Sequence, residues 1–309
     1  MFPRAEGDLR SFWQDTPIPS FNHKQVSWSL KQFLGIASGL RNIHVHQDSV
    51  KATQPSKPIT EYREVIQGVE RYGRHGDIKL ENILWFHSSN HEPEGRGILK
   101  IADFGLGRFH GQDTRSRVNP DYIRGSPTYE PPECKLHQSV SRAYDMWSLG
   151  CLYLEFVTWL LKRWDAVEKF ADARCSSNSE IVTPGGSFYA IWPSEVPHGP
   201  DAVVRDSVLH WIEDLHGTPR CSAALHNLLD LIQDALPVVN PALRISAEKL
   251  TELLKDILGR GEADASYLIT PVPRLKPQNI CPRKRALSYD PSQSRFDEVA
   301  KNMRLWRPP

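Results

Sequence analysis

The sequence predicts a mainly helical domain with a few short strands, and three observations lead to this prediction. Apolar residues recur at helical spacing in three segments, which indicates helices that each bury one face. A nearly continuous apolar run over 146–161 contains one acidic residue and is shorter than a membrane span, so it favours a helix buried in a protein core. Two short apolar runs, 83–86 and 98–102, are typical of strands.

The first helix is expected over about 25–46, because its apolar residues form one stripe. A polar, proline-containing stretch over about 47–72 follows, and it indicates a surface insertion with a short helix at 59–69. Residues 88–97 are typical of a hairpin loop between the two strands. The stripe of the first helix consists of Leu30, Phe33, Leu34, Ala37 and Leu40.

The second half of the chain predicts one more insertion and two closing helices. The insertion is expected over about 162–206, since Thr183-Pro184-Gly185-Gly186 is typical of a loop. The closing helices have leucine-rich stripes at 225–236 and 250–258, and Gly259 and Gly261 are expected to stop the second of them. The proline-rich, basic segment 262–309 is expected to be a flexible tail.

Composition limits the classes of partner and of compartment. Lys plus Arg number 38 against 37 for Asp plus Glu, so bulk charge gives no reason to expect nucleic acid or a membrane surface as a partner. Five scattered cysteines without a C-x-x-C pair support neither a disulfide framework nor a zinc site. No apolar leader follows Met1. We therefore expect an intracellular protein, cytoplasmic or nuclear.

The residues with the most chemical potential lie in the stretch from His75 to Asn82. Asp77 can accept a proton from an attacking hydroxyl, and Lys79 can neutralise a phosphoryl oxygen during transfer. Asn82 offers a hard oxygen to Mg²⁺, and Asp103, at the end of the second strand, offers a carboxylate. The sequence therefore favours phosphoryl transfer, whereas chance turn residues would be the alternative for either motif alone.

The order of these motifs and of three later ones resembles the eukaryotic protein kinase family, of the Ser/Thr type. The resemblance implies a protein-kinase-like fold of the α+β family, of which this chain is mainly the helical large lobe with short β-hairpins. It also implies ATP and Mg²⁺ as cofactors and a protein as substrate. The motifs are His75–Asn82, Asp103-Phe104-Gly105, Gly125–Glu133, Asp145–Gly150 and Asn240–Ala247.

Further roles follow from the resemblance alone. Leu84 would lie under the adenine ring and Asp8 would reach the ribose, so that Asn82, Asp103, Leu84 and Asp8 would form the nucleotide and metal site. Ser126 would hydrogen-bond Asp77 and Lys79, and Glu133 would form a buried ion pair with Arg244. The other supporting residues would be His75, which supports the backbone, Phe104, which packs beside it, Gly105, and Asp145 at the start of the central helix.

Two departures from the family pattern affect what we expect of this chain. No G-x-G-x-x-G loop and no Val-Ala-Ile-Lys-like strand precede Asp77, and residues 1–9 are similar to the hinge between the lobes. We therefore expect a kinase large lobe over 1–261 that binds ATP weakly or not at all, with an exposed apolar face where a partner can bind. Gly76 replaces the usual arginine that clamps a phosphorylated loop.

Two alternative functions remain open at this point. A catalytically inactive scaffold would also lack the phosphate-covering loop, although such a protein would often lose Asp77 or Asp103 as well. Small-molecule phosphotransferases share the His75-Gly76-Asp77 pattern, but they normally lack a lysine at position 79 and the Phe104-Gly105 pair.

Overall fold

The computed structural model describes residues 4–44, 72–87, 96–104, 108–110, 126–136, 138, 140–175, 185–192 and 201–274. Its helices are α1 (Leu9–Asp15), α2 (His23–His44), α3 (Pro132–Lys135), α4 (Ala143–Lys162), α5 (Trp164–Cys175), α6 (Asp206–His216), α7 (Ala223–Ala235), α8 (Ala247–Ala263) and α9 (Ala265–Ile269). Its strands are β1 (Gly7–Asp8), β2 (Tyr72–Arg74), β3 (Ile83–Phe86), β4 (Ile98–Ile101), β5 (Arg108–His110), β6 (Tyr189–Trp192) and β7 (Asp201–Val204).

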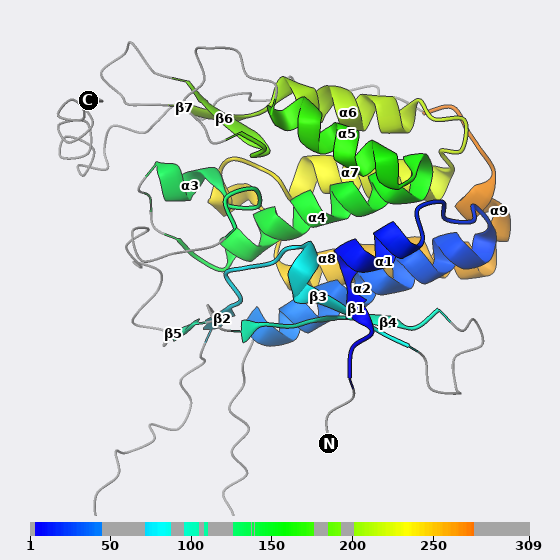
Figure 1. Ribbon diagram of the computed structural model, residues 1–309, viewed down its shortest axis with the longest axis horizontal. Helices are drawn as coiled ribbons and strands as arrows, with labels where there is room; N and C mark the ends of the chain where they lie inside the picture. Colours follow the sequence, from blue (N-terminus) through cyan, green and yellow to red (C-terminus); the bar gives the residue numbers. More distant parts are fainter. Residues whose placement is uncertain are drawn as a thin grey trace, which may run out of the picture.

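Helix α4 is the centre of the fold. It lies between the α2–α8 pair and the layer of α5 and α6 (Figure 1), and every residue over 144–161 is buried. A helix buried on all sides needs apolar residues on all faces, which explains why this run shows no helical stripe. The prediction of a buried core helix is confirmed. Among the described residues, no helix combines the length and the apolar character that a membrane crossing requires.

Helix α2 carries the predicted stripe and packs it against α8 and β4. Leu30, Phe33, Ala37 and Leu40 are buried on this face, so the prediction of an amphipathic helix is confirmed. The described part of the expected insertion over 47–72 is limited to Tyr72, and the expected helix at 59–69 lies outside the described residues.

The strands near the N-terminal half form one small antiparallel sheet in the order β1–β3–β4. Ile83 pairs with Ile101 across β3 and β4, and Asp8 pairs with Leu84 across β1 and β3. The predicted strands at 83–86 and 98–102 are therefore confirmed to within one residue. Two further antiparallel pairs are β2–β5, which joins segments more distant in the sequence, and the β6–β7 hairpin.

The expected end of the domain at residue 261 is wrong, and so is the role of the two glycines. Helix α8 continues past Gly259 and Gly261 to Ala263, since a glycine inside a helix is tolerated when neighbouring side chains pack well. Helix α9 follows directly and packs on α2, α7 and α8 through Leu268, which is 3% exposed. The folded unit thus includes the first part of the expected tail, and residues 275–309 lie outside the described residues.

The expected insertion over 162–206 is folded at both of its ends. Its first part is α5, which packs on α4 and α6 through the buried side chains Val167 and Phe170. Its last part is the β6–β7 hairpin, whose Tyr189 is buried as well. These segments belong to the core because their apolar side chains cover α4, which would otherwise be exposed to water.

Candidate active site

The carboxylate of Asp77 is the point on which three donors converge. Asp77 lies in the loop between β2 and the short 3₁₀ helix η1 (Leu80–Asn82), and it is 8% exposed. Its Oδ2 accepts from Nζ of Lys79 at 2.7 Å and from Nδ2 of Asn82 at 2.9 Å. Its Oδ1 accepts from the backbone N–H of Ser126 at 3.1 Å. These contacts hold the carboxylate in one orientation at the edge of the folded core.

The side chain of Asn82 is oriented by the same loop. Nδ2 also donates to the backbone oxygen of Asp77 at 2.8 Å, so both amide hydrogens face Asp77. The amide oxygen Oδ1 takes part in neither bond. Because an amide oxygen is a hard donor, it suits Mg²⁺ better than it suits a softer metal.

The loop that carries Asp103 is attached through one residue to the loop from His75 to Asn82, which is the candidate catalytic loop. The N–H of Ala102 donates to the backbone oxygen of Asn82 at 2.8 Å, and its carbonyl accepts from Nε2 of His75 at 2.9 Å. Asp103 itself is exposed and has a φ of 61°, in the left-handed region that few residues other than glycine adopt. Strained backbone of this kind is concentrated at functional sites.

The ring of His75 supports the backbone on both sides. Nε2 faces the carbonyl of Ala102, and Nδ1 accepts from the N–H of Asp77 at 3.2 Å. A carbonyl can only accept and an amide N–H can only donate, so these two contacts require a hydrogen on Nε2 and a lone pair on Nδ1. Phe104 contacts this ring edge-on at 5.2 Å between centroids, but it is 54% exposed and is not enclosed by the described residues.

Asp145, the first acidic residue of α4, is fully buried beneath the same loop. Its oxygens accept from the N–H groups of His75 and Gly76, each at 2.8 Å, and from Nε2 of His44 at 2.9 Å. Burial alone would raise the pKa of Asp145, but the bond from His44 and the two backbone bonds outweigh it and lower the pKa. The central helix thus holds the catalytic loop by a charged anchor.

Gly76 occupies a backbone position that suits glycine. Its φ is 83°, in the left-handed region where a side chain would be strained. The departure from arginine at this position therefore agrees with the local backbone. Arg74, two residues earlier, is 5% exposed and lies 5.6 Å from the ring centre of Tyr144.

The two residues expected at the nucleotide lie side by side in the sheet. Asp8 pairs with Leu84 across β1 and β3, and Leu84 is half-buried. Asp8 also caps helix α1, since its Oδ1 accepts from N–H and Oγ of Ser11 at 2.8 and 2.9 Å. The chain near Asp8 is therefore fixed rather than frayed, and its carboxylate has a structural role of its own.

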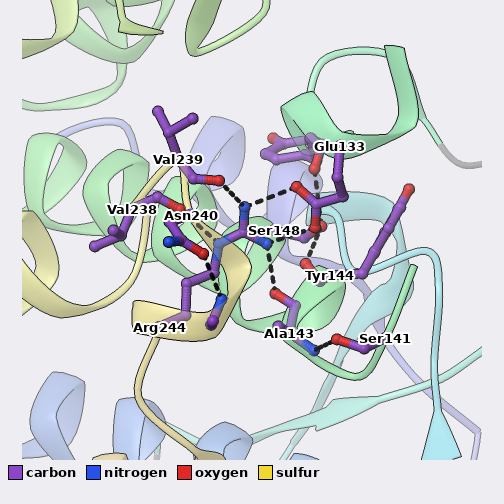
Figure 2. A network of polar contacts seen from close by, with 11 residues as sticks. Glu133, Ser141, Ala143, Tyr144, Ser148, Val238, Val239, Asn240 and Arg244 are labelled. Atoms are coloured by element: carbon purple, nitrogen blue, oxygen red, sulfur yellow. Dashed lines mark hydrogen bonds and ion pairs between the residues drawn. The ribbon is translucent and has the colours of Figure 1, made fainter. Parts of the chain in front are cut away.

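Glu133 and Arg244 form the ion pair that the resemblance implies (Figure 2). Nη1 and Nη2 of Arg244 donate to the two carboxylate oxygens at 2.6 and 2.7 Å. The remaining donors of Arg244 reach the carbonyls of Val238, Val239 and Ala143 at 2.6, 3.0 and 2.9 Å. All five N–H groups of the guanidinium are therefore satisfied, and this pair ties α3 to α4 and to the segment before α8.

Ser126 contacts Asp77, one of the two residues that the resemblance implies as its partners. The bond comes from its backbone N–H, which donates to Oδ1 of Asp77 at 3.1 Å. The turn over 126–129 explains this, because the N–H groups of Tyr129 and Glu130 both bond back to the oxygen of Ser126 and orient its backbone. Gly105, the remaining expected residue, lies outside the described residues.

A second network, which the sequence analysis did not predict, supports the 126–130 segment. The hydroxyl of Tyr129 donates to Oε2 of Glu155 at 2.6 Å, and Nη2 of Arg174 donates to Oε1 at 2.8 Å. Arg174 lies 4.2 Å from the ring centres of both Phe170 and Phe188. Burial, and then Glu155, raise the pKa of Tyr129 well above its usual value. A lone glutamate in an apolar helix was the only available indication that a buried cation lies nearby.

Comparison with known proteins shows which family this sequence resembles. Residues 70–253 match a sequence model of the protein kinase domain. The chain is 29% identical to cyclin-dependent kinase C-1 of Arabidopsis thaliana over 247 residues, which cover 76% of this chain and 42% of that protein. It is 29% identical to cyclin-dependent kinase 9 of Xenopus tropicalis over 182 residues, 56% of this chain and 43% of the relative.

A shorter and more similar match lies in mitogen-activated protein kinase kinase kinase 20 of Arabidopsis thaliana, which is 44% identical over 82 residues, 26% of this chain and 21% of that protein. Each match spans less than half the length of the curated relative. The domain match covers more than half of the chain, from before the catalytic loop into α8. The chain belongs to the protein kinase family.

Proposed function

We propose that this protein transfers the γ-phosphoryl group of ATP to Ser or Thr hydroxyls of a protein substrate. The observation that carries the proposal is the convergence of Lys79, Asn82 and Ser126 on the carboxylate of Asp77. Phosphoryl transfer requires little covalent help from the protein, so catalysis depends on groups held in position before the reaction. Asp77 is fixed in this way by its three donors.

In the proposed mechanism, Asp77 orients the substrate hydroxyl and accepts its proton. Lys79, whose side chain is 26% exposed, swings from Asp77 toward the transferred group and offsets its negative charge. Asn82 Oδ1 and the carboxylate of Asp103 would hold Mg²⁺. The bound cation would neutralise negative charge on the phosphate oxygens. Leu84 would contact the adenine, and Asp8 would lie toward the ribose.

A lysine at position 79 favours Ser and Thr over Tyr as the acceptor, by resemblance to the Ser/Thr type of the family. The relatives named as cyclin-dependent kinases and as a mitogen-activated protein kinase kinase kinase support the same class.

The proposal includes a partner that would bind beside the exposed side chain of Phe104. Phe104 is 54% exposed beside His75, and it is the one large apolar side chain that the described residues expose at the site. The other exposed large apolar residues, Ile18, Leu243 and Val272, lie on other elements, so an extended apolar face does not appear among the described residues. An intracellular location also stays a prediction.

The test is a phosphoryl-transfer assay with labelled ATP at high concentration, Mg²⁺, and matched peptides that contain Ser, Thr or Tyr. We expect transfer to the Ser and Thr peptides, and a loss of about 10²–10⁴-fold in rate for Asp77→Asn. Asp165→Asn changes an exposed carboxylate on α5 and serves as the control. Calorimetry with MgATP, compared with Asp103→Ala, separates loss of binding from loss of chemistry. No transfer by the folded chain at any MgATP concentration would favour the scaffold function instead.

A further inference from the structure

A buried cluster of nitrogen and sulfur donors lies far along the chain from the catalytic loop, between α6 and α7. His216 ends α6, Cys221 lies in the connection, and His226 is in the first turns of α7. Their exposed fractions are 7%, 1% and 6%. One donor atom from each residue lies within 4.8 Å of the other two. Two imidazoles and a thiol are the donor set of a borderline-soft transition metal.

The two imidazole rings face each other through the same nitrogen. Nδ1 of His216 and Nδ1 of His226 are 2.7 Å apart, and the ring planes differ by 9°. Sγ of Cys221 is 3.5 Å from Nδ1 of His226. Around a tetrahedral Zn²⁺ with Zn–N of about 2.0–2.1 Å, two nitrogens would be about 3.3 Å apart, so the rings would have to separate by about half an ångström.

The outer nitrogens of the rings fit the surroundings of metal-bound histidines. Nε2 of His226 donates to the carbonyl of Val272 at 2.9 Å, which leaves its Nδ1 without a hydrogen and available as a ligand. Nε2 of His216 faces Oδ1 of Asp230 at 3.5 Å. A carbonyl or a carboxylate behind each ring is the usual outer partner of a histidine that binds a metal.

Without a metal, the hydrogen bonds of this cluster leave Nε2 of His216 buried and without a hydrogen-bond partner. Because His226 Nδ1 must accept, His216 Nδ1 must donate, and a neutral His216 then has no hydrogen on Nε2. That atom is buried without a hydrogen-bond partner and faces a carboxylate, which also can only accept.

We propose that His216, Cys221 and His226 bind a Zn²⁺-class cation. The cation replaces the hydrogen between the two Nδ1 atoms, and that hydrogen moves to Nε2 of His216, where Asp230 accepts it. The thiol of Cys221 loses its proton to solvent, so one proton is released for each cation bound. Three protein ligands leave the fourth position of a tetrahedron to a water molecule.

The site would fasten the last described segment to the domain. Val272 donates its N–H to the carbonyl of Cys221 at 3.2 Å, and its own carbonyl accepts from His226. Arg274, two residues on, pairs with Glu213 of α6 at 2.9 Å and with Asp230 of α7 at 2.7 Å. The cation would therefore join α6, α7 and the segment after α9, a structural role separate from phosphoryl transfer.

The test is a titration of the full chain with Co²⁺ in the presence of excess Mg²⁺, which occupies sites made only of oxygen. We expect one equivalent of Co²⁺ with a thiolate-to-cobalt charge-transfer band, displaced by Zn²⁺, and a melting temperature that Zn²⁺ raises by several degrees. Cys221→Ser should lose the band, whereas Cys175→Ser, an exposed cysteine on α5, should keep it. His226→Gln should lose tight binding, and His210→Gln, exposed on α6, should not.

Absence of the band in the wild-type chain would overturn the proposal, and so would a band that persists in both Cys221→Ser and His226→Gln. An equal rise in melting temperature for wild type and His226→Gln would also overturn it. Should Cys221→Ser fail to fold, the wild-type titration and the His226→Gln variant decide the question without it.

Discussion

Arg244 meets Glu133 in a bidentate ion pair in which no donor of the guanidinium is left without an acceptor. The two residues are 111 positions apart in the chain, and both side chains are at most 1% exposed. A buried ion pair is stabilising only when its remaining hydrogen bonds are also made, and here the carbonyls of three residues make them. The pair therefore fixes α3, which follows the 126–130 segment, to the core.

Removing one partner of this pair should be severely destabilising. For Arg244→Met, we expect a loss of about 3–5 kcal/mol in the free energy of unfolding, because the Glu133 carboxylate stays buried without a counter-charge. Urea unfolding measures this change in the free energy of unfolding. The double variant Glu133→Leu with Arg244→Met should be more stable than Arg244→Met alone. Lys249→Ala, which breaks an exposed pair with Glu252, is the control. A loss within about 0.5 kcal/mol for Arg244→Met would contradict the prediction.

The anchor at Asp145 should make stability depend on pH on the acid side. Its pKa in the folded protein is lower than in the unfolded chain, so its contribution is present above the unfolded pKa of about 3.9 and is lost as pH falls through the folded value. Asp145→Asn removes this titration. The difference in unfolding free energy between wild type and Asp145→Asn should be constant from neutral pH down to about 5 and should shrink below about 4.

Urea midpoints at a series of pH values check this dependence. Asp15→Asn changes an exposed carboxyl on α1 and should leave the midpoint unchanged at neutral pH. A difference between wild type and Asp145→Asn that grows toward low pH would have the opposite sign and would refute the assignment.

Substitutions in the network around Glu155 should lower the free energy of unfolding by different amounts. Tyr129→Phe removes a bond to a charged acceptor and should cost about 1.5–3 kcal/mol. Arg174→Met leaves Glu155 buried with no cation and should cost about 3–5 kcal/mol. Tyr153→Phe, which loses a bond to the neutral carbonyl of Phe33, is the matched control and should cost about 0.5–1.5 kcal/mol. Thermal or urea unfolding ranks the three variants by their loss in the free energy of unfolding. A larger loss for Tyr153→Phe than for Arg174→Met would contradict the prediction.

Two helical glycines should respond in opposite directions to alanine. A Cβ at Gly150 would lie 2.6 Å from Cβ of Leu236 and 3.0 Å from Cδ of Pro237, so Gly150→Ala should cost about 1–3 kcal/mol. A Cβ at Gly259 would have no atom within 4 Å, and Gly259→Ala should stabilise by about 0.4–1 kcal/mol. Melting temperatures of the two variants test this, and a shift of the same sign in both would show that packing at α4 is not the cause.

The catalytic loop could be predicted because its chemistry is local. Asp77, Lys79 and Asn82 lie within six residues, so the contacts of Asp77 with Lys79 and Asn82 follow from a short stretch of backbone. The burial of α4 could also be predicted, since exposing a long apolar run with one glutamate to water would be unfavourable. Helix α2 followed from its stripe for the same reason.

Contacts between distant segments were beyond the sequence, unless the family resemblance supplied them. The pair of Glu133 with Arg244 came from the resemblance, whereas the pairs of Glu155 with Arg174 and of His44 with Asp145 were not predicted. Likewise, Gly259 and Gly261 suggested a helix end, but the packing of Leu268 against α8 decided that the helix continues. Sequence spacing alone determined helices α2, α4, α7 and α8, strands β3 and β4, and the set of polar residues in the loop from His75 to Asn82. Only the tertiary structure decided which buried charges meet, because each buried charge must find a partner wherever the chain brings one.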